Sequence, residues 1–393
     1  EDAAGRKDID YDVTVTARTM WPLKTAGRTG RPCMVRIPHM RNWSPEDPFL
    51  YDVHIKMGND SVESYFAMRK IEVKNDKNGI PRIFLNNKPY FQKGVLDQGY
   101  WPDGLYTPPC DEAMIYDIQK MKDLGFNMIR KHIKIEPQRW YYHCDRLGMI
   151  VWQDMVNGGS AYKHWFVTYL ATLMNWNHIS FSDDEKHAGL LSRLHPEGKD
   201  EFRREITETI AFLYNHPSIV VWVPFNEGWG QFDALAACEQ IRTLDSSRLV
   251  DHASGWFDQK GGDILSLHYY FLKLKFKPES KRAVALTEFG GYSLSIPGHS
   301  CCKKVYGYKK FNSTGALTYG YIDLIRQTIL PAVKKGIGAT VYTQLSDIEE
   351  ETNGIYTYDR EICKIDPDTL RKWNRALKEA GECKTYADHP TDH

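Results

Sequence analysis

Short apolar runs of strand length alternate with amphipathic stretches over most of this 393-residue chain. Repeats of a buried strand and a crossover favour a parallel sheet in an α/β fold. Eight strands in roughly 300 residues match the size of a (β/α)₈ barrel. The predicted strands are residues 91–96, 126–129, 149–152, 219–225, 248–253, 264–267, 283–287 and 338–343.

Amphipathic segments between these runs predict the helices that would cover the barrel. They are residues 110–124, 136–147, 201–214, 232–244, 317–335 and 367–379. A doubly wound sheet is the alternative arrangement of such elements, but no glycine-rich phosphate loop follows the first predicted strand. The barrel is therefore the preferred α/β architecture.

Residues 9–75 follow a different pattern, in which apolar and polar positions alternate over short runs separated by Gly, Pro and Asn. Such a pattern is typical of a β-sandwich. We expect a sandwich over residues 1–78 and the barrel over residues 79–393. The first stretch is shorter than a sandwich of about 100 residues, so we expect it to be truncated, with a segment upstream.

The charge balance narrows the class of partner. Lys plus Arg and Asp plus Glu both number 51, so no long-range field favours nucleic acid or an anionic membrane surface. The 11 Trp and 23 Tyr residues suit a carbohydrate, because flat aromatic faces stack on sugar rings. We therefore expect an oligosaccharide or glycoside substrate, and neither a nucleic-acid nor a membrane partner. A homo-oligomer is left open.

Cysteine and histidine spacing indicates neither a disulfide scaffold nor a metal site. The eight Cys residues include no CxxC pair, and the 14 His residues include neither HExxH nor HxH. We expect mostly free thiols, no metal and no cofactor. An extracellular, a periplasmic and a cytoplasmic location all stay open.

Barrel chemistry takes place at the carboxyl ends of the strands, where this sequence has two glutamates. Glu227 follows the fourth predicted strand and Glu288 follows the seventh. Paired carboxylates can protonate a departing glycosidic oxygen and attack the opposite face of the sugar. Asn226 precedes Glu227, and its amide can bind the hydroxyl next to the reacting carbon. These residues predict a glycosidase.

Several segments carry motifs of a known family, which strengthens this prediction. They are Asn215-His216-Pro217-Ser218-Ile219 with Trp222 and Asn226-Glu227, Trp43-Ser44-Pro45-Glu46-Asp47-Pro48-Phe49-Leu50-Tyr51, Arg69-Lys70-Ile71, Leu85-Asn86-Asn87-Lys88-Pro89, and Gly125-Phe126-Asn127-Met128-Ile129-Arg130. Together they resemble glycoside hydrolase family 2, the β-galactosidase and β-glucuronidase family, over residues 40–360. The resemblance implies a catalytic barrel preceded by an immunoglobulin-like domain.

The resemblance also implies roles for individual residues. Glu227 matches the family's general acid/base and Glu288 its nucleophile, which implies a retaining exo-glycosidase acting on terminal β-linked sugars. Arg130 matches an arginine that orients the nucleophile, and Tyr269 resembles a tyrosine that hydrogen-bonds to it. Asp154 matches an acidic residue that binds a sugar hydroxyl.

Three further positions belong to the predicted substrate site. His268 and Trp256 lie at equivalent rim positions, although a structural role for the histidine is an equal alternative. Gln344 stands where the family often has a tryptophan platform, so an amide replaces an apolar face and the sugar stays undetermined. The segment 351–360 resembles uncharacterised branches of the family.

Two alternatives to an exo-glycosidase stay open at this point. One is a barrel that binds glycans without cleaving them, and the other is a glycosidase of different sugar or endo specificity. The connection from Asp154 to about Asp200 is long enough to be a functional loop. It carries Tyr162, Trp165, Trp176 and His178, and it predicts either a wall of the sugar cleft or a loop packed on the barrel flank.

Overall fold

Eight parallel strands form a nearly closed barrel in the computed structural model, which describes residues 8–18, 20–177, 179–271 and 273–382. The order of hydrogen-bonded neighbours is β12-β11-β10-β9-β8-β17-β14-β13. This confirms the predicted (β/α)₈ fold. The strands are β8 (Gln92–Asp97), β9 (Met128–Lys131), β10 (Ile150–Asp154), β11 (Ile219–Val223), β12 (Leu249–Val250), β13 (Ile264–Tyr269), β14 (Ala283–Gly290) and β17 (Ile337–Thr343).

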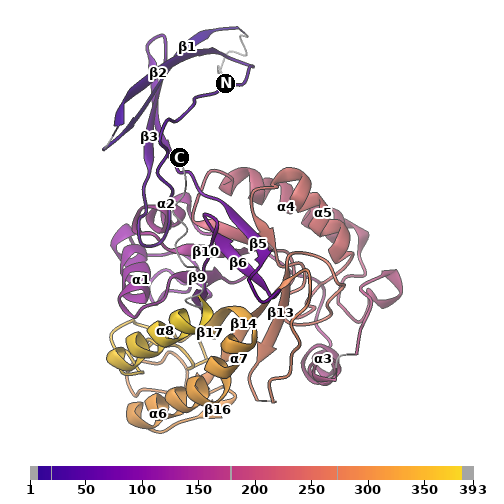
Figure 1. The fold of residues 1–393 in the computed structure, drawn as a ribbon. Helices are drawn as coiled ribbons and strands as arrows, with labels where there is room; N and C mark the ends of the chain where they lie inside the picture. The colour runs from indigo at the N-terminus through magenta and orange to yellow at the C-terminus, as the bar shows by residue number, and fades with distance from the viewer. Residues whose placement is uncertain (1–7, 19, 178, 272, 383–393) are drawn as a thin grey trace.

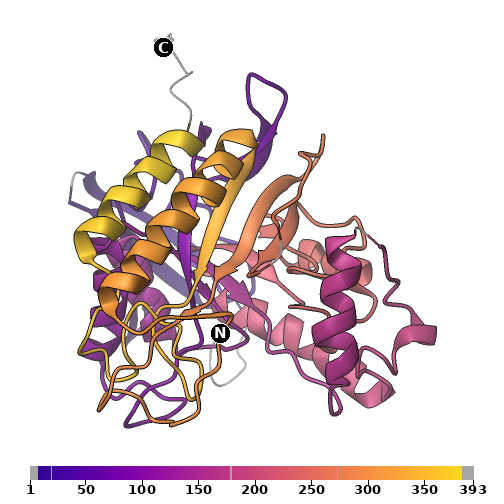
Figure 2. The same ribbon diagram turned by 90° about the horizontal axis from the view of Figure 1, so that it is seen from below.

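Helices surround most of this barrel, as Figures 1 and 2 show. They match the predicted amphipathic segments, with the segment 317–335 formed by two α-helices joined through a π-helical turn. The connections β12–β13 and β13–β14 carry no helix among their described residues. The helices are α1 (Asp111–Asp123), α2 (Gln138–Leu147), α4 (Pro196–Leu213), α5 (Ala234–Leu244), α6 (Thr314–Leu324), η3 (Ile325–Ile329), α7 (Leu330–Lys335) and α8 (Pro367–Gly381).

The barrel strands are buried along both faces, which explains why they appear in the sequence as continuous apolar runs. Every residue of β11 is buried. Apolar side chains on one face fill the barrel interior, and those on the other pack under the helices. The short turn after α2 depends on Gly148, whose φ of 73° lies in the left-handed region that favours glycine at a helix end.

Two antiparallel sheets precede the barrel. Strands β1 (Asp10–Ala17), β2 (Met20–Arg28), β3 (Tyr51–Met57) and β4 (Asp60–Phe66) form a sheet in the order β2-β1-β3-β4. Strands β5 (Ile71–Asn75), β6 (Pro81–Leu85) and β7 (Lys88–Pro89) form the second. The β5–β6 hairpin spans the predicted domain boundary at residues 78 and 79. That boundary and the immunoglobulin-like assignment stay predictions.

The antiparallel part is attached to the amino ends of the barrel strands. The four-stranded sheet extends away from the barrel in Figure 1. The Arg69 guanidinium donates to the carbonyl of Ile219 at the start of β11, and the Arg82 guanidinium donates to that of Ile337 at the start of β17. The carboxyl ends of the strands therefore stay free for a site.

The long connection between β10 and α4 contains helical segments of its own. They are η1 (Trp165–Leu170), α3 (Ala171–Trp176) and the single turn η2 (Glu185–His187). In both views α3 stands apart from α6, α7 and α8. His178 lies outside the described residues. In the part of the chain that the structure describes, no helix has the length and hydropathy needed to cross a bilayer.

Candidate active site

A cavity of about 540 Å³ opens at the carboxyl ends of the barrel strands. Its lining includes both predicted catalytic glutamates, Glu227 and Glu288. Much of the remaining wall comes from the segment after β13, from the loop after β17 and from residues 168–176 of η1 and α3. The connection between β10 and α4 therefore forms one wall of the cavity, which was one of its two predicted arrangements.

Glu227 lies four residues beyond the end of β11, in a turn that holds its backbone tightly. Its φ of 51° is in the left-handed region, which a non-glycine residue keeps only where its surroundings fix it. Its N–H donates to the carbonyl of Ser254, 2.9 Å away. The side chain is buried, and this burial raises the pKa of Glu227 to about 7, although the charge of Arg130 lowers it.

His268 on β13 is the hydrogen-bond partner of Glu227. Its Nδ1 lies 2.8 Å from Glu227 Oε1. Burial lowers the pKa of His268 to about 4, so the ring is neutral at neutral pH and the contact is a hydrogen bond rather than an ion pair. A neutral Nδ1 can donate to an ionised Glu227 or accept from a protonated one. The His268 ring fits there because residue 255 is a glycine, since a Cβ at that position would lie only 2.6 Å from the ring.

Glu288, near the end of β14, is held by two donors. Arg130 Nη1 donates to its Oε1 over 3.2 Å, and the Tyr270 hydroxyl donates to its Oε2. Burial and the neighbouring Glu227 carboxyl raise the pKa of Glu288 above its usual value, and the interactions with His268, Arg130 and Tyr270 oppose this rise. Both donors stabilise the carboxylate form. These two contacts favour the anion of Glu288, whereas Glu227 has no such donor beyond His268 among the described residues.

The two carboxyl groups share one small space. An oxygen of Glu227, an oxygen of Glu288 and a ring nitrogen of His268 all lie within 4.8 Å of one another. Carboxyl groups about 5–5.5 Å apart are typical of retaining glycosidases, whereas inverting enzymes leave about 6.5–9.5 Å for a water. The same three groups are within reach of a common metal ion, but Arg130 and Tyr270 already engage Glu288.

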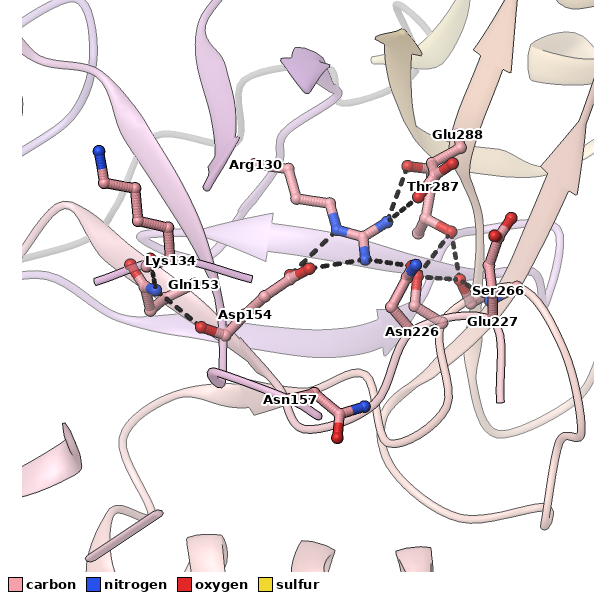
Figure 3. A network of polar contacts seen from close by, with 12 residues as sticks. Arg130, Lys134, Gln153, Asp154, Asn157, Asn226, Glu227, Ser266, Thr287 and Glu288 are labelled. Atoms are coloured by element: carbon pink, nitrogen blue, oxygen red, sulfur yellow. Dashed lines mark hydrogen bonds and ion pairs between the residues drawn. The ribbon is translucent and has the colours of Figure 1, made fainter. Parts of the chain in front are cut away.

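Arg130 is fully buried and joins several of the predicted site residues (Figure 3). Its guanidinium makes a two-point contact with Asp154 at 3.0 and 2.9 Å and donates to Asn226 Oδ1 over 2.8 Å. Burial opposes this charge, but the carboxylates of Asp154 and Glu288 outweigh it and raise the pKa of Arg130. Arg130 therefore contacts Glu288 as the sequence analysis expected.

Asp154 and Tyr269 occupy other places than the expected ones. Asp154 lies beneath the cavity with both oxygens on Arg130, and this placement does not support contact with a sugar hydroxyl. The hydroxyl that reaches Glu288 belongs to Tyr270, not to Tyr269. Tyr269 is the last residue of β13 and packs partly against the hydrophobic core, although it also borders the cavity.

Trp256 and Gln344 differ in their access to the cavity. Trp256 lines it, with its ring centroid 6.4 Å from that of His268. Gln344 is buried behind the lining, and its amide donates to Glu351 Oε2 and Asn353 Oδ1. It therefore supports two residues of the wall and does not present the amide face that the sequence analysis expected beneath the sugar.

Sequence reasoning missed several residues that line the cavity, because most of them come from irregular segments whose path it does not give. They are Gln98, Trp229, Tyr270, Tyr306, Tyr308, Glu351 and Asn353. Tyr270 directly follows the residue that was chosen. Glu351 and Asn353 lie in the segment 351–360, which the sequence analysis had noted without assigning a role.

Comparison with known proteins agrees with this arrangement. The family described as "Glycosyl hydrolases family 2, TIM barrel domain" matches residues 77–328. This chain belongs to glycosyl hydrolase family 2. The β-galactosidase of Leuconostoc mesenteroides subsp. mesenteroides is 27% identical over 366 residues, which cover 88% of this chain and 31% of that protein. The β-galactosidase of Oenococcus oeni is 30% identical over 230 residues, which cover 57% and 19%.

Solved structures share the fold of this family 2 chain. The β-D-glucuronidase of Dictyoglomus thermophilum superposes with a TM-score of 0.69 at 14% identity, over 94% of this chain and 64% of the other. A family 2 β-galacturonidase from Eisenbergiella tayi gives 0.63 at 19% identity, over 94% and 66%. The family 2 chain described here spans less than a third of the length of the two β-galactosidases.

Proposed function

We propose that this chain is the catalytic part of a retaining exo-glycosidase that hydrolyses terminal β-linked sugars. The observation that carries the proposal is the meeting of Glu227 and Glu288 at the ends of β11 and β14, with carboxylate oxygens within 4.8 Å of each other. Such spacing suits attack by one carboxylate and proton donation by the other. Membership of family 2 and the curated relatives named β-galactosidase support the same reaction class.

The reaction would proceed by double displacement. Glu288 attacks the anomeric carbon as its bond to the leaving oxygen breaks, and Glu227 gives that oxygen its proton. A covalent glycosyl ester on Glu288 results. Glu227, now ionised, then takes a proton from a water molecule as that water attacks the anomeric carbon. The ester bond to Glu288 breaks, and the sugar leaves with its original anomeric configuration.

The environment of each carboxyl group fits its role. Glu227, with a pKa raised to about 7 by burial, is about half protonated at pH 7 and largely protonated below that pH, so a proton donor is available when substrate binds. Glu288 is held as an anion by Arg130 and Tyr270. Arg130 also orients the amide of Asn226, which is placed to bind the hydroxyl next to the reacting carbon.

Trapping of the covalent intermediate tests this proposal. A panel of 2-deoxy-2-fluoro-β-glycosides should inactivate the protein with time, and mass spectrometry of peptides should place the adduct on Glu288. Glu288→Ala and Glu227→Gln should each lower kcat/KM for aryl β-glycosides by a factor of at least about 100. The matched control is Glu208→Gln, because Glu208 lies on α4 and its side chain is 66% exposed.

Near-wild-type turnover by either active-site variant would refute the assignment. Binding of sugars without hydrolysis by the wild-type protein would instead support a glycan-binding barrel. Release of internal oligosaccharides from a polysaccharide, with no release of terminal sugars, would overturn exo action.

A further inference from the structure

A cluster of polar side chains borders the cavity beside the two catalytic glutamates. It consists of Gln98 after β8, Gln344 after β17, and Glu351 and Asn353 on the following loop, and we call it the Glu351 cluster. Gln98 Nε2 and Gln344 Nε2 both donate to Glu351 Oε2, over 3.2 and 3.0 Å. Gln98, Glu351 and Asn353 line the cavity. No proposed step of the reaction uses this cluster.

Internal hydrogen bonds fix the orientation of the cluster. Gln98 Nε2 also donates to Gln344 Oε1 over 3.0 Å, and Gln344 Nε2 donates to Asn353 Oδ1 over 2.7 Å. The N–H groups of both glutamines are therefore engaged inside the cluster. Among the described residues, no hydrogen bond engages Glu351 Oε1, Gln98 Oε1 or Asn353 Nδ2.

The groups that stay available suit sugar hydroxyls. Two acceptor oxygens and one amide donor can bind hydroxyl groups, each of which both donates and accepts. A carboxylate on the ligand only accepts hydrogen bonds, so it finds no donor at Glu351 or Gln98 Oε1. Neutral hydroxyl-bearing sugars therefore match this wall of the cavity better than acidic sugars do.

The acidic side chains around the cavity also favour a neutral sugar over an acidic one. Glu227, Glu288 and Glu351 are the acidic side chains among the described residues that line it, and Glu227 carries no charge in its proposed role as proton donor. Arg130 does not offset them for a ligand, because Asp154 and Glu288 already occupy its guanidinium. Like charges placed close together in a partly buried site repel each other, so an anionic glycone is disfavoured.

Lysines reach the cavity from the segment after β13. Lys273 and Lys275 line the side formed with α3, where the Lys275 ammonium lies 4.1 Å from the centroid of the Trp176 ring and the Lys273 carbonyl accepts from the Trp176 indole. Glu351 lies on another loop, the one after β17, where it forms an isolated β-bridge with Tyr306. The fold itself does not decide the sugar class, because solved structures named β-glucuronidase and β-galacturonidase share it.

We propose that Glu351, held by Gln98 and Gln344, binds hydroxyls of a neutral terminal sugar and excludes uronic acids from the site. This inference rests on the proposed glycosidase function, since it names the class of sugar that the same cavity accepts. Glu351 is a specificity-determining residue here, and Gln344 is a positioning residue that acts through it. Gln98 positions Glu351 and also offers its own Oε1 to the sugar.

Paired substrates test the inference. Aryl β-galactoside and aryl β-glucoside are compared with the corresponding β-galacturonide and β-glucuronide, and kcat/KM is measured for each. The better neutral substrate should exceed its uronide by a factor of at least about 100. Glu351→Gln, which keeps the shape of the side chain, should reduce that ratio at least about tenfold, through lower activity on the neutral sugar and less exclusion of the uronide.

Glu350→Gln is the matched control, because the adjacent Glu350 side chain is 42% accessible and does not line the cavity. It should leave the ratio unchanged. A wild-type protein that prefers uronides would overturn the proposal, particularly if Lys273→Ala or Lys275→Ala abolished that preference. An unchanged ratio in Glu351→Gln would overturn it as well.

A binding measurement separates this inference from the proposed function. If no aryl glycoside is cleaved, the proposed function fails, and titration with galactose and galacturonic acid still tests Glu351. Trp229 and Trp256 line the cavity, so their fluorescence can report binding. Tighter binding of galactose, weakened by Glu351→Gln, supports the inference. Equal or tighter binding of galacturonic acid contradicts it.

Discussion

At the scale of single residues, the two catalytic carboxyl groups differ in what surrounds their charge. Glu288 receives hydrogen bonds from a guanidinium and a phenol, and both stabilise its anion. Glu227 is buried and faces a neutral imidazole, so its pKa is raised to about 7. The difference supports the proposed role of Glu227 as proton donor on physical grounds that do not depend on the sequence motif.

The raised pKa of Glu227 gives a prediction for the pH dependence. Glu227 must be protonated for the first step, so kcat/KM should fall as the pH rises through about 7. At lower pH the limit comes from protonation of Glu288. In Glu227→Gln, measured with a 2,4-dinitrophenyl glycoside whose leaving group needs no proton, the alkaline limb should vanish. A limb of unchanged position in this variant would mean that the titration of another group causes it.

A second prediction concerns the tyrosine that holds the nucleophile. Tyr270→Phe removes the hydroxyl that donates to Glu288 Oε2, so kcat/KM should fall by a factor of about 10–100, the value of one hydrogen bond to a charged group. Tyr269→Phe is the matched control, because Tyr269 borders the same cavity without a described hydrogen bond to Glu288. A large loss in Tyr269→Phe with little change in Tyr270→Phe would contradict the structural assignment.

The sequence located the two glutamates and the arginine at their positions, but it placed the tyrosine one position away. Strand ends and the acid motif were enough to choose Glu227 and Glu288, and the family resemblance added Arg130. The choice between Tyr269 and Tyr270 depends on where β13 ends, and element boundaries are the least certain part of a sequence-based prediction. Glu351 could not be found in this way, because its approach to the cavity depends on contacts with Gln98 and Gln344 that are distant in the sequence.

At the scale of elements, hydrophobic patterning was sufficient wherever a segment is buried on a regular face. Strand β11 and helix α8 lie where their apolar patterns predicted them. Irregular connections carry no such period, so their paths were not predictable. The helix α3 is an example, since it lies inside a connection that had no predicted element, yet residues 168–176 form a wall of the cavity.

The wall and the strand ends make different contributions to the site. The strands fix Arg130 and Glu288 through buried hydrogen bonds, which gives the reacting groups a defined geometry. Residues of η1, of α3 and of the segment after β13 contribute exposed aromatic and apolar side chains, such as Tyr169 on η1 and Phe271 after β13. The regular elements thus carry the chemistry, and the irregular ones shape access to it.

At the scale of the whole molecule, part of the family signature serves assembly of the structure. Asp145 is fully buried and accepts hydrogen bonds from the Tyr65 hydroxyl and the Ser218 N–H, at 2.6 and 2.8 Å, with His216 Nδ1 also 2.7 Å from it. His216 and Ser218 belong to the motif that precedes β11. They therefore connect the amino end of that strand to β4 of the N-terminal sheet rather than to the substrate.

Trp43 makes a similar connection and provides a test of it. Its fully buried side chain packs with apolar residues of the barrel interior, and its indole N–H donates to the carbonyl of Asp145 over 2.7 Å. Trp43→Ala should lower the free energy of unfolding by about 3–5 kcal/mol, because it leaves a cavity and an unpaired carbonyl. Trp21→Ala is the matched control, since Trp21 on β2 is 90% exposed, and it should change stability by less than about 0.5 kcal/mol.

Urea titrations that follow both circular dichroism and hydrolysis of an aryl glycoside distinguish two arrangements of the molecule. If the N-terminal part stabilises the barrel through Trp43, both midpoints should fall together in Trp43→Ala. If the two parts unfold separately, the midpoint for loss of activity should stay at its wild-type value. The site at the carboxyl ends of the strands would then be independent of the sheet bound to their amino ends. That result would contradict the stabilising role expected from the core that Trp43 shares with the barrel strands.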